Sequence, residues 1–171
     1  MKAPRTALCA LLAALALTVA SCDNSTPTGP TPDPSILGNL GGGLGLVRCS
    51  PLPYDSVTQT VGSAGGTIHV GPHVLTIPAG ALENPVTITA VAPSDTVNAV
   101  RFGPAGLTFD RPASLTLSYT NCSLVARLLP KRIAYVSDDL HILEYLLSLD
   151  ILSLRKVSGP LHHFSVYAVA W

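Results

Sequence analysis

Cysteine and histidine are the residues of this chain whose spacing could carry chemistry, and there are four cysteines and five histidines. His69 and His73 flank a Gly-Pro pair and could meet across a hairpin, but no third metal ligand accompanies them. Asp138, Asp139 and His141 lie together in a stretch typical of a solvated turn. The sequence contains no nucleophile elbow, phosphate-binding loop, zinc-protease helix or paired-carboxylate signature. We therefore expect no metal, no cofactor and no enzyme that acts on a separate substrate.

The amino-terminal segment has the parts of a secretion signal. Two basic residues precede an apolar run over residues 7–20, about 14 residues where a membrane-spanning helix needs roughly 20. The run ends in Val19-Ala20-Ser21-Cys22, which resembles the bacterial lipobox, in which the cysteine thiol is lipidated before the chain is cleaved on its amino side. We expect residues 1–21 to be a lipoprotein signal peptide and Cys22 to carry the lipid. The alternative is an ordinary secretory peptide that is cleaved without lipidation.

Two cysteines remain for the folded domain. Cys9 leaves with the signal peptide and Cys22 carries the lipid, so that Cys49 and Cys122 are left as a pair. Such a pair forms a disulfide in an oxidising compartment outside the cytoplasm. We predict a Cys49–Cys122 disulfide, and closing so long a loop would stabilise the fold by on the order of 4 kcal/mol in the chain-entropy model. The alternative is two free, buried thiols.

Residues 22–48 are expected to be the lipidated cysteine and a tether. The segment after Cys22 is rich in Pro and Thr, and residues 41–43 are three consecutive glycines. This composition cannot bury a core of its own, and it is typical of a linker with a semi-rigid half and a flexible joint. The tether would hold the domain, residues 49–171, away from the membrane.

The charge balance argues against nucleic acid as a partner. Cleavage removes Lys2 and Arg5 from the ten basic residues, so eight basic residues stand against ten acidic ones. The basic residues cluster only at Lys131-Arg132 and Arg155-Lys156. A nucleic-acid-binding domain normally carries a basic patch or an excess of positive charge.

From Tyr54 onward the pattern is that of an all-β domain. Short segments rich in Val, Ile and Thr alternate apolar with polar residues, and Gly, Pro, Asn and Asp separate them. Two packed sheets around one core, a β-sandwich, is the expected architecture. Residues 140–149 could instead form one short helix. The predicted strands cover residues 57–61, 67–70, 74–77, 86–91, 114–119, 132–136, 142–147, 151–157 and 164–171.

Several blocks resemble one family in order and spacing. They are Gly65-Gly66-Thr67-Ile68, Leu75-Thr76-Ile77-Pro78-Ala79-Gly80-Ala81-Leu82, Val86-Thr87-Ile88, Phe102-Gly103-Pro104-Ala105-Gly106-Leu107-Thr108-Phe109 and His163-Phe164-Ser165-Val166-Tyr167-Ala168-Val169. Together they resemble the ZU5 domain over about residues 56–171, and the chain departs from it in a leucine-rich stretch between Asn121 and Gly159. The resemblance implies a β-sandwich that serves as a protein-interaction module. ZU5 domains occur in receptors, ankyrins and death-domain scaffolds, so no particular partner transfers to this chain.

The same resemblance points to one reactive sequence. His163-Phe164-Ser165 resembles the self-cleavage site of some ZU5-containing scaffolds, in which the serine attacks the preceding carbonyl. This implies an N-to-O acyl shift by Ser165 onto Phe164, with His163 or His162 as general base. A regular strand argues against it, because it holds His163 and Ser165 about 6.5 Å apart along its axis. The alternative is a terminal strand with two faces, one lined by Phe164, Val166, Ala168 and Ala170 and the other by His163, Ser165 and Tyr167.

These observations favour a membrane-tethered, extracytoplasmic interaction or structural module of the bacterial cell envelope. Its partner would be an envelope protein or a polysaccharide, met through sheet edges and loops. The alternatives are self-cleavage between Phe164 and Ser165, or a domain with no dedicated partner. Asp23, directly after Cys22, resembles the enteric signal for retention in the inner membrane. That rule does not hold in all bacteria, and we favour the outer membrane or the cell surface.

Overall fold

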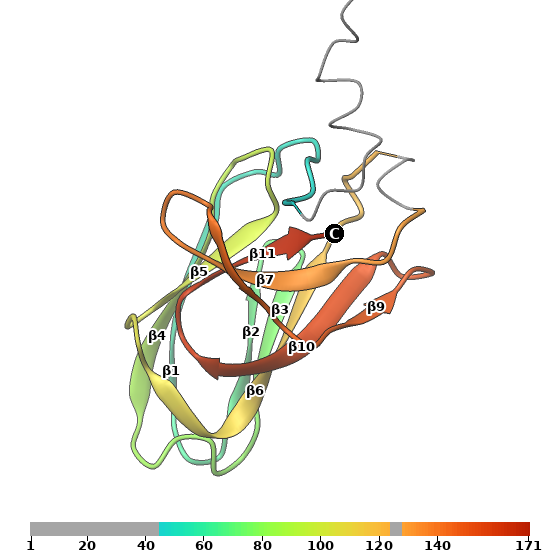
Figure 1. Cartoon of the computed structure of the whole chain (residues 1–171). Helices are drawn as coiled ribbons and strands as arrows, with labels where there is room; N and C mark the ends of the chain where they lie inside the picture. The colour runs from blue at the N-terminus through green and yellow to red at the C-terminus, as the bar shows by residue number, and fades with distance from the viewer. Residues whose placement is uncertain (1–44, 124–127) are drawn as a thin grey trace, which may run out of the picture.

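The described part of the chain is built from strands alone. A computed structural model of the chain describes residues 45–123 and 128–171, so that the expected signal peptide, Cys22 and most of the expected tether lie outside them. These residues form eleven strands and no helix, and none of their segments is a helix able to span a bilayer (Figure 1). The strands are β1 Asp55–Val61, β2 Gly66–Val70, β3 His73–Ile77, β4 Val86–Ala92, β5 Ala99–Gly103, β6 Thr108–Ser118, β7 Arg132–Val136, β8 Ile142–Tyr145, β9 Leu149–Ile151, β10 Lys156–His163 and β11 Val166–Ala170.

The strands form two antiparallel sheets, as the prediction of an all-β sandwich requires. The first sheet has six strands in the order β1-β4-β5-β11-β7-β8, and the second has five in the order β2-β3-β6-β10-β9. Consecutive strands β1 and β2 are edges of the two sheets, and so are β8 and β9. The sandwich therefore has two open sides, one bounded by β1 and β2 and the other by β8 and β9.

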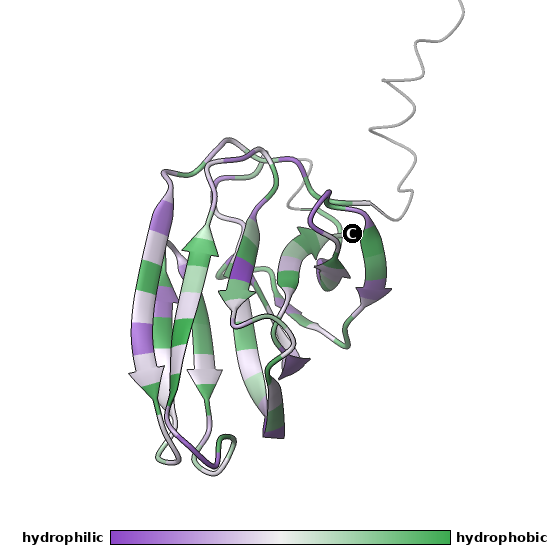
Figure 2. Cartoon of the chain, turned by 90° about the vertical axis from the view of Figure 1, so that its left-hand side faces the viewer, coloured by the Kyte–Doolittle hydropathy of each residue, from purple (hydrophilic) through white to green (hydrophobic). Residues whose placement is uncertain are grey.

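Alternating side chains build the core between the sheets. In β3, His73, Leu75 and Ile77 are buried while Thr76 is exposed, and the outer strands in Figure 2 show the same alternation as bands of colour. Leu115 in β6 is buried against them. Burying one Leu or Ile side chain contributes roughly 1.5–3 kcal/mol, so the alternating valines, leucines and isoleucines fix which face of each strand points inward.

Strand β11 is buried on both faces. Tyr167 and Val169 belong to the main core, whereas Val166, Ala168 and Ala170 belong to a second, smaller apolar cluster on the outer face of the six-stranded sheet. This second cluster was not expected from the sequence, which suggested a single core. Small side chains on this face allow other parts of the chain to pack closely over it.

One of those parts is the segment of residues 45–48. Leu46 forms a bridge with Ala170, Val47 donates its N–H to Val169 O at 2.9 Å, and Val47 is fully buried. We expected these residues to belong to the tether, with the domain starting at Cys49. The structure places them in the domain, because the chain beside the end of β11 supplies hydrogen bonds that β5 no longer provides.

The leucine-rich stretch is not a helix. Residues 140–149 contain β8 and the first residue of β9, which lie in different sheets, and the chain crosses between them at residues 146–148. The crossing is fixed by Leu146 N, which donates to Ile133 O at 2.8 Å, and by Ser148 Oγ, which accepts from Ile133 N at 2.9 Å. The strand predicted over residues 151–157 is also wrong, since a turn with Arg155 at φ 52° divides it into β9 and β10.

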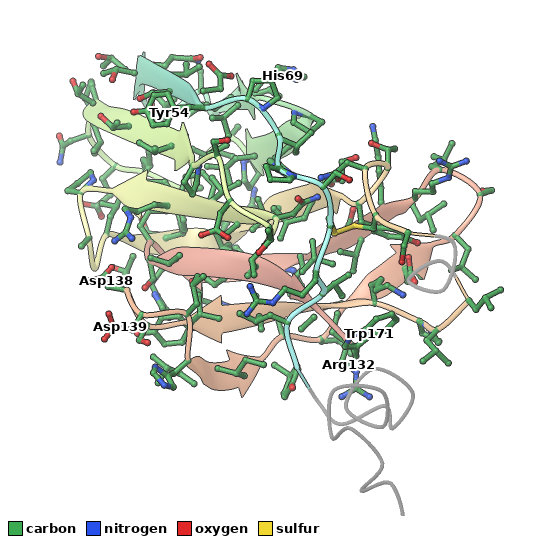
Figure 3. All side chains as sticks on the ribbon, turned by 90° about the horizontal axis from the view of Figure 1, so that it is seen from above. Tyr54, His69, Arg132, Asp138, Asp139 and Trp171 are labelled. Atoms are coloured by element: carbon green, nitrogen blue, oxygen red, sulfur yellow. A yellow bond between two sulfur atoms is a disulfide. The ribbon has the colours of Figure 1, made fainter. Side chains whose placement is uncertain are left out.

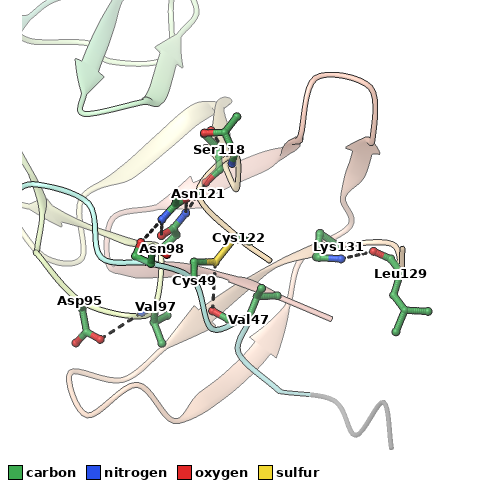
Figure 4. Close-up of a disulfide and its surroundings, with 12 residues drawn as sticks. Val47, Cys49, Asp95, Val97, Asn98, Ser118, Asn121, Cys122, Leu129 and Lys131 are labelled. Carbon is green, nitrogen blue, oxygen red and sulfur yellow. Dashed lines mark hydrogen bonds between the residues drawn. A yellow bond between two sulfur atoms is a disulfide. The ribbon is translucent and has the colours of Figure 1, made fainter. Parts of the chain in front are cut away.

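The predicted Cys49–Cys122 disulfide is present (Figure 4). It joins the segment before β1 to the loop after β6 across 73 residues of sequence, and a loop of that length corresponds to about 4 kcal/mol of loop-closure entropy. Beside it, Asn98 donates from Nδ2 to Ser118 O at 2.8 Å and to Asn121 Oδ1 at 2.7 Å. The disulfide and these amides hold one end of the sandwich together.

A buried histidine makes the stability of the fold depend on pH. His73 is fully buried and its Nδ1 accepts the N–H of Ser118 at 3.1 Å, a role that requires the neutral ring. Burial lowers the pKa of His73 from 6.5 to about 4. In the unfolded chain the ring titrates near its ordinary pKa of about 6.5, so between these values the unfolded chain binds a proton that the folded chain does not.

We therefore expect the stabilisation to be complete above about pH 6.5 and to be lost as the pH falls towards 4. The free energy of unfolding should drop by on the order of 2 to 3 kcal/mol between pH 7 and pH 4.5 from this residue. Urea unfolding at both pH values measures it against His73→Asn, whose amide oxygen can accept from Ser118 but does not titrate. An equal loss in both proteins would contradict this role of His73.

Candidate functional site

The chain bends sharply at the sequence that resembles a self-cleavage site. Strand β10 of one sheet ends at His163, strand β11 of the other begins at Val166, and Phe164 and Ser165 make the crossing between the sheets. The prediction of a continuous strand over residues 164–171 is therefore wrong at its start. So are its two predicted faces, because Phe164 and Tyr167 share the main core. The spacing of a regular strand, which argued against a contact between His163 and Ser165, does not apply here.

Backbone hydrogen bonds from the segment of residues 102–107 hold the bend in place. Phe164 N donates to Leu107 O at 2.7 Å, and Phe102 N donates to Ser165 O at 2.9 Å. Gly106 N donates to the carbonyl oxygen of Phe164 at 3.0 Å. Gly106 has φ 76°, which glycine adopts without the steric cost of a side chain. The carbonyl that Ser165 would attack is thus already polarised by a fixed N–H.

The side chain of Phe164 anchors the same peptide from the inside of the sandwich. Its ring is buried, stacks on Phe102 with centroids 5.1 Å apart and meets Phe109 edge-on at 5.0 Å. Such aromatic pairs contribute about 0.5–1.5 kcal/mol beyond the area they bury. The peptide between Phe164 and Ser165 is therefore restrained on both sides.

A histidine and a tyrosine lie beside the Phe164 carbonyl. His163 Nδ1 is 3.5 Å from Phe164 O, and Tyr167 Oη donates to His163 O at 2.8 Å and lies 3.4 Å from His163 Nδ1. Burial raises the pKa of Tyr167, so its hydroxyl stays protonated and remains a donor. The ring of Tyr135 packs edge-on against His163 at 5.2 Å. His162 is exposed, which leaves His163 as the histidine at this carbonyl.

This arrangement supplies part of what an acyl shift needs. If Ser165 Oγ attacked the Phe164 carbonyl, the negative charge would develop on an oxygen that faces Gly106 N–H and the His163 ring. Activation of the nucleophile is less well prepared. Among the described residues no hydrogen bond joins Ser165 Oγ to His163 or His162, so Ser165 has to rotate before a histidine can take its proton.

The other candidate groups do not assemble into a site. His69 is exposed and His73 is buried, so the two histidines of the β2–β3 hairpin do not meet. Asp138 pairs with Arg101 on the surface, and His141 N bonds to Ser137 Oγ at 3.1 Å within a turn. In residues 45–123 and 128–171, no three His, Cys, Asp or Glu side chains are grouped to hold a metal ion.

A further surface was not identified from the sequence. Leu143 on β8, Leu147 on the crossing and Leu149 on β9 are 57–85% exposed, and together they form what we call the leucine edge. On the opposite open side the outward residues of β1 are polar, with Thr58 and Thr60 bonded to threonines of β4. The sequence did carry a signal for this surface. The leucines of residues 140–154 fall on every face of a strand or a helix, and one buried face cannot hold all of them.

The chain matches no family model and no curated protein. The similarity to ZU5 domains remains a prediction from the quoted sequence blocks, and the function has to be argued from the surfaces of this chain itself.

Proposed function

We propose that the chain is a lipid-tethered module of the bacterial cell envelope that binds a protein partner through the leucine edge. The observation that carries the proposal is the exposure of Leu143, Leu147 and Leu149 along one open side of the sandwich. Anchorage comes from lipid on Cys22, which the lipobox-like sequence supports. The outer membrane or the cell surface is the expected location.

Exposed leucines on an edge are unusual enough to need a partner. Single exposed apolar side chains are common on soluble proteins, but a contiguous apolar patch marks an interaction surface. Each of these leucines would contribute roughly 1.5–3 kcal/mol if an interface buried it fully. The edge strands β8 and β9 also offer backbone groups to which an extended segment of a partner can add.

The leucine edge favours protein over polysaccharide as the partner. Sugar hydroxyls lose their hydrogen bonds to water on binding, and an aliphatic surface returns none. A protein segment instead buries its own apolar side chains against the leucines while its backbone pairs with the edge strand. The polar β1 and β2 side, by contrast, resembles the protected sheet edges of proteins that avoid pairing.

The anchor is tested by replacing its cysteine. We expect Cys22→Ser to abolish incorporation of labelled palmitate and to move the protein from the membrane fraction to the soluble fraction. Cys9→Ser is the matched control, because Cys9 lies within the signal peptide and should leave labelling unchanged. Equal labelling of the Cys22→Ser form, or no labelling of the wild-type protein, would contradict the lipid anchor.

The leucine edge is tested by photo-crosslinking in intact cells. A photoreactive amino acid at position 147 should give an adduct of defined mass, because the partner covers this side chain. The same amino acid at position 59, an exposed site on the opposite edge strand β1, should give none. Adding Leu143→Asp and Leu149→Asp should remove the adduct at position 147. Adducts that are identical at both positions would show that the leucine edge has no specific partner.

A second candidate function is self-cleavage at the bend, and it is supported by the hydrogen bond from Gly106 to the Phe164 carbonyl. Ser165 Oγ would bond to the Phe164 carbonyl carbon while the Phe164–Ser165 C–N bond breaks, and the proton of the hydroxyl would pass through His163 to the new amine. Water would then hydrolyse the ester. The product of residues 165–171 would stay in place, since β11 lies between β5 and β7 and is buried on both faces.

Mass spectrometry of the denatured protein tests self-cleavage. If the bend is active, the wild-type chain should lose residues 165–171 completely, Ser165→Ala should stay whole, and Ser165→Thr should retain cleavage because it keeps the hydroxyl. Hydroxylamine should accelerate the reaction, because it attacks the ester intermediate. A wild-type chain of full mass after prolonged incubation would eliminate self-cleavage and would leave the binding function unaffected.

A further inference from the structure

We infer that one end of the sandwich rests on the lipid bilayer, with four exposed leucines inserted into its interface. They are Leu128 and Leu129, in the loop before β7, and Leu152 and Leu154, in the turn between β9 and β10. We call them the leucine tips, and they are distinct from the leucine edge. The inference rests on the proposed lipid anchor at Cys22, which would keep this end close to a membrane.

The two loops that carry the leucine tips share one sequence pattern. Each has two leucines that are 47–77% exposed, and each is followed by two basic residues, Lys131-Arg132 in one and Arg155-Lys156 in the other. Apolar side chains at the very end of a loop, with cations just behind them, match the layering of a bilayer interface. The leucines would reach the acyl boundary while Arg132, Arg155 and Lys156 remain at the depth of the headgroups. Lys131 is buried and supports the loop from inside.

Both tips lie at the end of the sandwich where the described chain begins. Arg132 at the start of β7 pairs with Ala170 at the end of β11, and Trp171 N donates to Gly45 O at 3.0 Å. Arg155 O accepts from Tyr119 N at 2.9 Å. Lys131 Nζ connects the two sheets here, since it lies 4.0 Å from the centroid of the Trp171 ring and 5.4 Å from that of Tyr119. The tips therefore surround the place where the tether joins the domain.

The charge at this end suits an anionic bilayer. Arg48 and Arg132 are exposed, and Arg155 and Lys156 are half-buried. Three acids share this end with them, and one of these, Asp55, accepts from Gly71 N through Oδ2. Asp150 accepts from Tyr119 Oη and Lys131 N, and Asp95 accepts from Thr96 Oγ1 and Val97 N. Each cation near an anionic membrane contributes about 1 kcal/mol.

Two further exposed acids, Asp138 and Asp139, lie at the other end. Figure 3 shows Arg132 and Trp171 together and Asp138 with Asp139 on the far side of the molecule. The loop with the two aspartates follows the last residue of β7, Val136, whereas Arg132 is its first. The described cations at the end near Trp171 outnumber the acids there, so this is the end that an anionic surface would attract.

The length of the tether explains why a bilayer is the expected occupant. Residues 23–44 separate Cys22 from the first described residue, Gly45. A chain of that length reaches at most about 75 Å when fully extended, and less in any other conformation. A lipid on Cys22 would therefore hold the tips at a high effective concentration relative to the membrane, so that even weak insertion would be populated.

Trp171 supplies a reporter for the experiment, because it is the only tryptophan of the chain and lies among the tips. The mature chain with Cys22→Ser, which carries no lipid, is mixed with vesicles of phosphatidylethanolamine and phosphatidylglycerol that carry brominated acyl chains. We expect quenching of Trp171 fluorescence on binding. Serine at all four tips should lower the partition coefficient at least tenfold. Leu143→Ser with Leu147→Ser, on the leucine edge, should change it less than twofold.

A charge variant covers the case in which the tip variant folds poorly. Arg132→Gln with Arg155→Gln should weaken binding to the anionic vesicles by roughly 10- to 30-fold and leave binding to neutral phosphatidylcholine vesicles unchanged. Absence of both binding and quenching in the Cys22→Ser chain with unchanged tips would overturn the inference, and so would equal losses in the tip and edge variants. Because this protein carries no lipid, such failures leave the anchor at Cys22 and the leucine edge untouched.

Discussion

The burial of β11 on both faces is the constraint on which the rest of the structure depends. Its inner face, with Tyr167 and Val169, completes the core between the sheets, and its outer face needs a cover. Leu46, from the segment that leads to the tether, and Ile142, from β8, pack over that face. Reaching this central position from β10 of the other sheet requires the bend before Val166. The position of one strand thus decides where residues 45–48 lie, where β8 lies and where the backbone turns.

The sequence predicts those parts of the fold that local alternation controls. β2, β3 and β4 follow from buried residues at every second position, and the disulfide follows from the expected compartment and the expected loss of the other cysteines. Strand β5 was missed, because Ala99–Gly103 has two adjacent buried residues and a charge in its middle. The bend was missed because its hydrogen-bond partners lie in residues 102–107, about 60 residues earlier along the chain. Nothing within His163-Phe164-Ser165 itself encodes them.

The candidate sites also differ in how much of each the sequence predicts. The reactive sequence could be found from its residues, but the polarised carbonyl depends on Gly106 and on the exit of β10 from its sheet. The leucine edge and the leucine tips could not be found by periodicity, because alternation assigns leucine to a core and says nothing about how many leucines the core accepts. Eight buried positions in β7 and β11 already fill both faces of this part of the six-stranded sheet. The leucines of residues 143–154 then have no interior left to occupy.

The proposed surfaces are compatible because they lie on different parts of the sandwich relative to β11. The leucine tips lie at the end where β11 finishes, and the bend lies at the opposite end, where β11 starts. The leucine edge runs along the side of the sandwich between them. If the leucine tips contact the bilayer, β8 and β9 therefore point away from it and stay accessible to a protein partner. Cleavage at the bend would act far from the bilayer, and the freed strand would still carry Trp171 at the membrane end. Release of the strand would expose both apolar clusters to water and break its hydrogen bonds to β5 and β7. A cleaved strand would therefore stay in place.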